Sequence, residues 1–480
     1  MIINESKYIL FINILLSFLL SIETKRNLIN DNIDNISTNE NKKLLFVWEH
    51  FRHGARVPDA KVNKKTWIDF IGVQWKSEGE LNEIGLRAHY LLGIATKNRY
   101  KEFLSKSFDT NEMFIISSDK NRTIVSAMAN LQGIYKNYTT HNLTENQIKR
   151  SNNIKFNQTY KDKIEKKIEE MKKSYVEKGI SIMPIHLFSR VGLQFRLNEK
   201  DYCPGITKYK EEAKNQPEVK KYIYGIQKYT NETYGKYIFQ FMNVSLDKQS
   251  NYLFENDNLY FICDTYIADY VSGREMPHIY KTNIDMDQFY YHCLNNSIID
   301  LYYGEYGLPP TKGVDLIVSP IFRTIFNYMD RRIALDKEKT PDKLDPSSPR
   351  FVIYSGHDST IAAIDVFLKK ELNISYDNPE YTTSQLIELW RNETGYFVTY
   401  LYNQEEKAVF NLNYFKEKIN KAIFSENEVY RMCGIENDIK NINIIKRQNL
   451  YETTFIISIG MVIISLSLLI SVSILKRKNM

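Results

Sequence analysis

The 480-residue sequence lacks the features that mark nucleic-acid-binding and zinc proteins. Its formal net charge is only +6 and is spread along the chain, and it carries no DNA- or RNA-binding signature, so we expect no nucleic-acid partner. The four cysteines include no C-x-x-C pair and no cluster with histidine, which argues against structural zinc. His50 and His53 have the spacing of an H-x-x-H pair, but no further ligand lies nearby in the sequence, so we expect neither a metal nor another cofactor.

Long uncharged apolar runs are scarce, and two stand out near the ends of the chain. Lys7 precedes an apolar run at residues 8–20, which is too short to span a bilayer comfortably. This pattern predicts a secretory signal peptide at residues 1–22, with a buried N-terminal helix as the alternative. Residues 455–475 are uncharged and mostly apolar, and this length crosses a hydrocarbon core of about 30 Å, so we predict a transmembrane helix there.

The residues that flank the predicted span set its orientation. A basic tail at residues 476–480 should stay on the cytoplasmic side, and it disfavours removal of the span as a glycolipid-anchor signal. Together with the signal peptide, this predicts a single-pass type I membrane protein whose bulk is lumenal or extracellular. The short tail has no tyrosine-based sorting signal, which favours the cell surface over an acidic, lysosome-like vesicle.

An oxidising compartment fits the cysteines and the glycosylation sequons. The four cysteines can form two disulfides in any of three pairings, and they are Cys203, Cys263, Cys293 and Cys433. Acceptor sequons for N-glycans are numerous, and a lumenal location would make several of them usable. They include Asn35, Asn137, Asn142, Asn157, Asn231, Asn243, Asn295, Asn373 and Asn392.

Composition divides the chain into segments. With 43% hydrophobic and 25% charged residues it is an ordinary globular protein, and its length suggests two or three domains. Residues 23–43 are polar and Asn-rich and predict a flexible leader, whereas residues 436–454 predict a juxtamembrane linker. Residues 195–295 are Tyr-rich and helix-leaning, so we interpret them as an inserted, mainly helical subdomain between residues 44–190 and 295–435.

Apolar runs and helical spacing predict the main elements. The predicted strands lie at residues 44–48, 113–116, 181–188 and 351–354, with a hairpin at residues 396–402 and 407–412. The predicted helices lie at residues 81–98, 120–135, 161–178 and 361–370, and residues 315–329 fit either a strand-to-helix segment or one helix. Residues 117–119 are of helix-capping type and are expected to cap the helix that follows them.

Polar residues suited to binding anions follow three of these strands. Strand ends are where open α/β sheets place ligand sites, and arginine binds phosphate or carboxylate oxygens bidentately. Each group alone also fits an ordinary solvent-facing position, but the three together predict one phosphoryl-binding pocket. They are Arg52, His53 and Arg56 after the strand at 44–48, Arg122 after that at 113–116, and His357 and Asp358 after that at 351–354.

Transfer of a phosphoryl group from a monoester needs a nucleophile, neutralisation of the phosphate oxygens and a proton for the leaving group. His53 would attack as a neutral imidazole and form a phosphohistidine. Asp358 would donate the proton as a general acid, and positive charge around a carboxyl makes its protonated form depend on an acidic medium. The oxygens would be neutralised without a metal by Arg52, Arg56, Arg122 and His357.

These residues give the sequence a resemblance to the histidine acid phosphatase branch of the histidine phosphatase superfamily. Residues 52–58 match the signature R-H-G-x-R-x-P, residues 79–85 match its downstream pattern, residues 118–123 match S-D-x-x-R-T, and residues 355–359 match S-x-H-D-T. The resemblance covers about residues 44–433. It implies that His53 is the phosphorylated nucleophile, that Arg122 and His357 bind phosphate, and that Asp358 is the proton donor.

The resemblance also implies an α/β fold, with a mixed central sheet flanked by helices as in phosphoglycerate mutase and a smaller, mainly helical cap over the active site. The expected activity is that of a metal-independent acid phosphatase acting on small phosphomonoesters. Two alternatives stay open: a phytase-like inositol-phosphate phosphatase and a catalytically silent phosphate-binding surface protein. A homodimer also stays open.

Further details follow from comparison with the family pattern. The pair Cys203–Cys433 resembles a family disulfide, and Cys293 would replace the missing usual partner of Cys263. Ala55 stands where prostatic-type enzymes have aspartate and phytase-like members have alanine, which leaves the substrate open. Asn121 lies in a sequon, but we expect no glycan there because it would block the site.

Overall fold

The computed structural model covers most of the region in which the family motifs occur. It describes residues 42–58, 78–135, 139–142, 144, 162–163, 166, 178–180, 183–187, 203–241, 244–254, 258–273, 284–299, 312–375 and 378–435. The predicted signal peptide, membrane span, linker and tail lie outside these residues, as do nearly all of the predicted leader and most of the helix predicted at 161–178. Within the described residues, no helix has the length and apolar character needed to cross a membrane.

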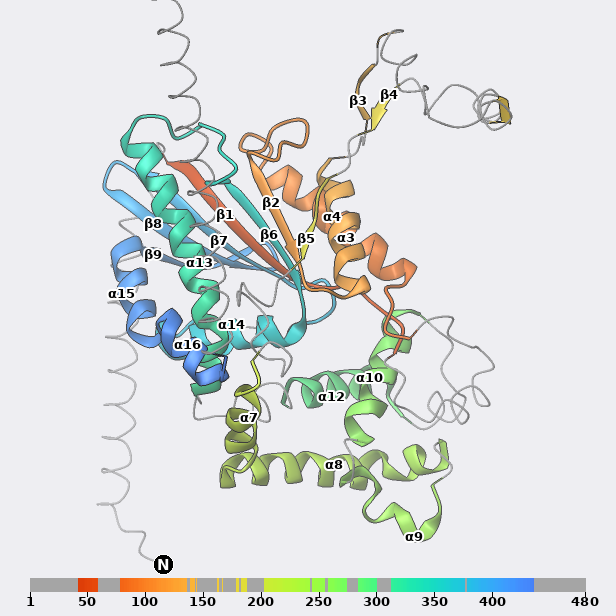
Figure 1. Ribbon diagram of the computed structural model, residues 1–480. Helices are drawn as coiled ribbons and strands as arrows, with labels where there is room; N and C mark the ends of the chain where they lie inside the picture. Colours follow the sequence, from red (N-terminus) through yellow and green to blue (C-terminus); the bar gives the residue numbers. More distant parts are fainter. Residues whose placement is uncertain are drawn as a thin grey trace, which may run out of the picture.

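Seven strands form one mixed sheet in the order β5-β2-β6-β1-β7-β8-β9 (Figure 1). The strands β5, β2, β6 and β1 pair in parallel, whereas β7, β8 and β9 are added antiparallel, so β1 joins the two halves. Their bounds are β1 Lys43–Arg52, β2 Met113–Ser117, β5 His186–Leu187, β6 Phe351–Gly356, β7 Ser384–Asn392, β8 Gly395–Tyr402 and β9 Glu405–Asn411. A separate antiparallel pair consists of β3 Thr139–Asn142 and β4 Lys178–Ile180.

The strand predictions hold for the apolar runs and fail where the strands carry polar residues. β1 was predicted at 44–48 but extends to Arg52. Its polar end is part of the strand because β6 and β7 pair with it there, with Arg52 opposite Gly356 of β6 and Phe51 opposite Ser384 of β7. The predicted hairpin is present as β8 and β9, whereas the strand β7 between β1 and β8 was not predicted. Within 181–188 the described strand is only β5.

Helices cover both faces of the sheet, and the alternation of side chains along β1 explains why. Val47 and Phe51 pack in one hydrophobic cluster with α3 and α4, whereas Phe46 and Trp48 pack in the other with α13, α14 and α15. The helices predicted at 81–98, 120–135 and 361–370 are confirmed, and residues 315–329 belong to one helix throughout. The bounds are α3 Glu83–Arg99, α4 Asn121–Ile134, α13 Lys312–Lys337, α14 Asp358–Leu372, α15 Leu412–Ala422 and α16 Glu426–Cys433.

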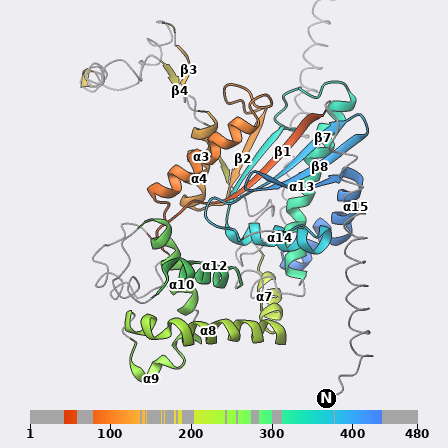
Figure 2. The same cartoon turned by 180° about the vertical axis from the view of Figure 1, so that it is seen from behind.

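The described residues between β5 and α13 are mostly helical and gather at one end of the sheet in both views (Figures 1 and 2). Both figures show the segment after β1 running toward α10 at this end. The elements are α7 Ile206–Lys214, α8 Pro217–Phe241, α9 Leu246–Gln249, a short 3₁₀ helix at Tyr252–Phe254, α10 Asn258–Val271 and α12 Met286–Ile299.

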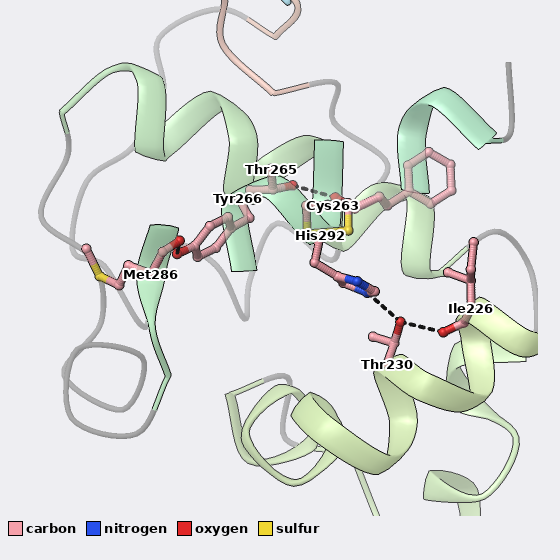
Figure 3. Close-up of a disulfide and its surroundings, with 9 residues drawn as sticks. Ile226, Thr230, Cys263, Thr265, Tyr266, Met286 and His292 are labelled. Atoms are coloured by element: carbon pink, nitrogen blue, oxygen red, sulfur yellow. Dashed lines mark hydrogen bonds between the residues drawn. A yellow bond between two sulfur atoms is a disulfide. The ribbon is translucent and has the colours of Figure 1, made fainter. Parts of the chain in front are cut away.

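Two disulfides tie these helices together and to the rest of the chain. Cys263 on α10 is bonded to Cys293 on α12, and Figure 3 shows this bond beside the hydrogen bond from His292 to Thr230 of α8. Cys203, just before α7, is bonded to Cys433 at the end of α16. Both pairings that the family resemblance implied are therefore present.

Candidate active site

The carboxyl ends of β1, β2 and β6 lie side by side, because these three strands are neighbours and run parallel. The backbone N–H of His53 donates to the carbonyl of Gly356 at 3.0 Å, and that of Ser118 donates to the carbonyl of Ser355 at 3.1 Å. These bonds continue the ladder one residue past the strand ends. The three polar segments, which are far apart in sequence, thus meet at one edge of the sheet, as the sequence predicted.

His53 is buried at this edge, with 2% of its surface exposed. Its Nδ1 lies 2.9 Å from the carbonyl oxygen of Gly54. Since a carbonyl only accepts hydrogen bonds, Nδ1 carries the proton and Nε2 keeps its lone pair in the neutral ring. The ring is 5.5 Å from that of His357 and 5.8 Å from that of Tyr381, measured between centroids. The geometry therefore leaves the lone pair of Nε2 available to a bound group.

The charges around His53 keep its ring neutral. Burial lowers the pKa of His53 well below its ordinary value, and the positive charges of Arg122, Arg52, His357 and Arg56 lower it further, in that order. These four groups are the ones that the sequence predicted to bind phosphate. They lie close enough to His53 to act on its protonation, so the structure brings all of them together.

Arg52 is held in place by three contacts. Its Nη2 lies 2.7 Å from Oδ2 of Asp358, and its Nη1 donates to the carbonyl of Pro379 at 2.7 Å. Its guanidinium carbon lies 4.3 Å from the centre of the Tyr381 ring, a cation–π contact. Asp358 is at the start of α14, and 31% of its side chain is exposed, so the carboxylate remains open to solvent.

Arg56 is bound by a carboxylate from a distant helix. Its Nη2 lies 2.7 Å from Oδ1 of Asp264 on α10, and its Nη1 lies 3.3 Å from Oδ2 of the same residue. Nη1 also donates to the carbonyl of Val57 at 3.0 Å. The sequence did not predict a role for Asp264 or for Tyr381, because both reach the site only through tertiary packing.

The segment that follows β2 differs from its prediction. α4 begins at Asn121 and its N-cap is Lys120, which makes no side-chain cap, so residues 117–119 do not cap it as expected. The hydroxyl of Ser118 instead lies 2.8 Å from Nε2 of His357 and 2.8 Å from the hydroxyl of Thr123. Ser118 is thus used to orient a site histidine. Arg122 projects from the first turn of α4, with Nη1 3.5 Å from the carbonyl of Gly79.

Close backbone contact fixes the turn after His53. A Cβ atom added to Gly54 would lie 2.6 Å from Cα of Gly85, and one added to Gly85 would lie 2.3 Å from the carbonyl oxygen of Ala55. Only glycine permits this approach between the turn and the first turn of α3. The pattern at residues 79–85 therefore has a structural meaning, because Gly85 lets α3 support the turn that carries Arg56.

Two other histidines of the sheet stack on aromatic rings. His50 is completely buried within β1 and stacks on Tyr354 at 4.4 Å between ring centroids. Its neighbour in the H-x-x-H spacing, His53, lies at the strand end with the arginines. His186 on β5 is exposed and stacks on Phe114 at 4.7 Å.

Comparison with known proteins agrees with this geometry. Residues 43–403 match the Histidine phosphatase superfamily (branch 2), and the chain belongs to this family. It is 35% identical over 100 residues to lysosomal acid phosphatase of Xenopus laevis, a match covering 20% of this chain and 22% of that protein. It is 33% identical over 99 residues to prostatic acid phosphatase of Homo sapiens, covering 20% and 24%. The matches thus span less than a quarter of these relatives' own length.

A solved structure shows the same fold. Hafnia alvei phytase in complex with myo-inositol hexakis sulphate has a TM-score of 0.52 and 13% identity, over 82% of this chain and 99% of that one. At this identity the likeness concerns the fold alone: an α/β architecture with a mixed sheet and flanking helices.

Proposed function

We propose that this protein is an acid phosphatase that hydrolyses phosphate monoesters through a phosphohistidine on His53. One observation carries the proposal: a buried, neutral histidine lies among Arg52, Arg56, Arg122 and His357, and Asp358 contacts Arg52. Family membership supports the same chemistry, and the short matches to acid phosphatases support the substrate class.

The proposed reaction has two steps. In the first, Nε2 of His53 forms a bond to phosphorus while the bond to the ester oxygen breaks, and Asp358 gives its proton to the departing alkoxide. In the second, the Asp358 carboxylate takes a proton from a water molecule, whose oxygen bonds to phosphorus and releases His53. The arginines and His357 stabilise the charge on the phosphoryl oxygens in both steps.

The contact between Arg52 and Asp358 would change when substrate binds. A phosphate dianion that binds Arg52 would take the place of Asp358 on the guanidinium. The displaced carboxyl group would then be available to the ester oxygen.

The first experiment is phosphate release from p-nitrophenyl phosphate by the purified full chain at pH 5, without added metal and with a chelator present. We expect turnover by the wild type and a loss of at least about a thousandfold in His53→Ala, because the nucleophile is removed. His186→Ala, which removes an exposed histidine outside the site, is the control and should keep full activity. Equal rates in wild type and His53→Ala would refute the nucleophile.

Inositol phosphates are a second candidate substrate class. Ala55 stands where phytase-like members of the family have alanine, which keeps this class open beside simple monoesters. A comparison of inositol hexakisphosphate with a simple alkyl phosphate at equal concentration would decide between the two classes.

We also propose that the catalytic part is lumenal or extracellular, with residues 195–295 as a helical cap and residues 455–475 as a membrane anchor. The two disulfides support an oxidising compartment. Protease protection of the intact chain in sealed vesicles tests this topology, and digestion of the cytoplasmic tail alone is the expected result.

A further inference from the structure

The ion pair between Arg56 and Asp264 is unusual for a phosphate-binding arginine. Both side chains are nearly buried, with 6% and 10% of their surface exposed. The two carboxylate oxygens contact Nη1 and Nη2, so the end of the guanidinium fork, which could otherwise bind phosphate bidentately, is already bonded to a carboxylate. Asp264 therefore competes directly with any anion that binds Arg56 through this edge.

Asp264 is also held firmly at this position. It follows Cys263, whose disulfide to Cys293 ties α10 to α12. Just after the end of this helix, the hydroxyl of Ser272 accepts a hydrogen bond of 2.8 Å from the side chain of Asn82, at the start of α3. α10 is thus fixed at two points near the turn that carries Arg56, so the carboxylate cannot easily move aside when an anion arrives.

The charges of the site show what Asp264 changes. Three arginines and His357 bring positive charge near the neutral His53, whereas Asp358 and Asp264 bring two negative charges. Asp358 has a role of its own as the proposed proton donor. Without Asp264, a phosphate dianion would meet one more net positive charge and would bind more tightly, as product as well as substrate.

We propose that Asp264 is a positioning residue that holds Arg56 from α10 and weakens the binding of the phosphate dianion, so that product phosphate leaves the site. This inference rests on the proposed function, because it concerns the release of its product. It gives a part in the reaction to α10, a helix that lies outside the catalytic motifs. If the ion pair served only to support the structure, breaking it would misplace Arg56. Phosphate binding would then become weaker rather than tighter.

The experiment measures binding of inorganic phosphate to the full chain by calorimetry, together with kcat and KM for p-nitrophenyl phosphate. In Asp264→Asn, which keeps the shape and removes the charge, we expect phosphate to bind about tenfold more tightly. KM should fall with it, while kcat stays level or falls because product leaves more slowly. Asp264→Glu keeps the charge and should stay within about threefold of the wild-type phosphate affinity.

Controls separate this role from a general effect on α10. Ser272→Ala breaks the hydrogen bond between Asn82 and the residue that follows α10 without changing a charge, and its phosphate affinity should equal that of the wild type. If Asp264→Asn does not fold, as judged by its thermal unfolding, Asp264→Ser carries the same expectation with a smaller side chain.

The possible results are distinct. If the wild type hydrolyses monoesters but the neutral variants bind phosphate no more tightly than it does, the role proposed for Asp264 is wrong. The proposed phosphatase activity would then still stand. Tighter phosphate binding in a chain that hydrolyses no monoester would overturn the proposed phosphatase instead.

Discussion

At the scale of single residues, the protonation of His53 decides the pH range of the enzyme. Its pKa lies well below the ordinary value, first because of burial and then because of the surrounding cations. A nucleophilic histidine of ordinary pKa would be increasingly protonated, and therefore inactive, below about pH 6.5. In this site burial and the cations favour the neutral ring, which the proposed acid phosphatase activity requires.

The quantity to follow is kcat/KM, corrected for ionisation of the substrate, as the pH falls to 5. We therefore expect no decline in it with a midpoint near pH 6.5. The reason is that kcat/KM reports the ionisation of the free enzyme, in which His53 is already neutral. The measurement is a pH–rate profile with p-nitrophenyl phosphate. An acid limb centred near pH 6.5 would contradict the burial of His53.

Asp358 gives a second prediction at this scale. Asp358→Ala should slow the hydrolysis of alkyl phosphates by about a hundredfold to ten-thousandfold, the usual contribution of a general acid. Aryl phosphates should be slowed much less, since a phenolate leaves without protonation. The test compares kcat for an alkyl and an aryl phosphate in the same preparation. Equal losses for both esters would show that Asp358 does not protonate the leaving group.

At the scale of elements, β1 carries more than the catalytic turn. Glu49 is fully buried in this strand, and its nearest hydrogen-bond donor is the hydroxyl of Thr96 on α3 at 3.1 Å. Burial raises the pKa of Glu49 to about 8, although the hydrogen bond from Thr96 lowers it slightly. The folded protein thus keeps a proton there between pH 4.5 and 8 that the unfolded chain releases. Its contribution to stability is therefore present at low pH and is lost as the pH rises through this window.

Glu49→Gln should remove this dependence, because an amide does not ionise. Relative to the wild type, the variant should gain stability between pH 5 and pH 8, by roughly 4 kcal/mol at most. Thermal unfolding at the two pH values measures the gain. Glu112→Gln is the contrasting variant: it removes a buried carboxylate that binds Arg350 at 2.9 Å, so it should destabilise the protein at both pH values. A difference between Glu49→Gln and wild type that does not change with pH would contradict the prediction.

The helices and strands also show which parts of the fold could be predicted from the sequence. Apolar runs located β2 and β6, and alternation located β8 and β9. Helical spacing located α3, whereas α4 and α14 were predicted from their positions after a strand and a polar turn. The end of β1 was missed because Glu49, His50 and Arg52 are polar yet paired on both sides. No corresponding strand was predicted for β7, although it pairs with β1 along most of its length.

In the candidate site, the motif residues could be predicted from the sequence and the residues outside the motifs could not. The motif residues follow strand ends, so their convergence could be inferred from the general position of ligand sites in α/β sheets. Asp264 and Tyr381 carry no such signal. Their positions depend on how α10 packs against the turn after β1 and on how residues 378–383 pass beside Arg52.

At the scale of the whole molecule, the disulfides differ in what they close. Cys203–Cys433 joins positions 230 residues apart, whereas Cys263–Cys293 joins positions 30 residues apart. Loop-closure entropy alone gives stabilisations of about 5 and about 4 kcal/mol. Replacing both cysteines of a pair by serine should lower the melting temperature in each case, and more for Cys203–Cys433.

The two bonds should also differ in their effect on the site. Only Cys263–Cys293 lies next to Asp264, so only its loss should change phosphate affinity in the protein that remains folded. Differential scanning calorimetry and phosphate titration of the two double variants make the comparison. Equal phosphate affinities in both would show that α10 does not need this disulfide to hold Asp264.

The position of β1 between the parallel and antiparallel halves of the sheet has a consequence for catalysis. The backbone of His53 is tied on one side to Gly356 and on the other to residue 382, whose N–H donates to the His53 carbonyl at 3.3 Å. The proposed nucleophile is therefore anchored like a core residue, and its backbone has little freedom to adjust to different esters. If the proposed function holds, accommodation of differently shaped leaving groups would fall to the helical side.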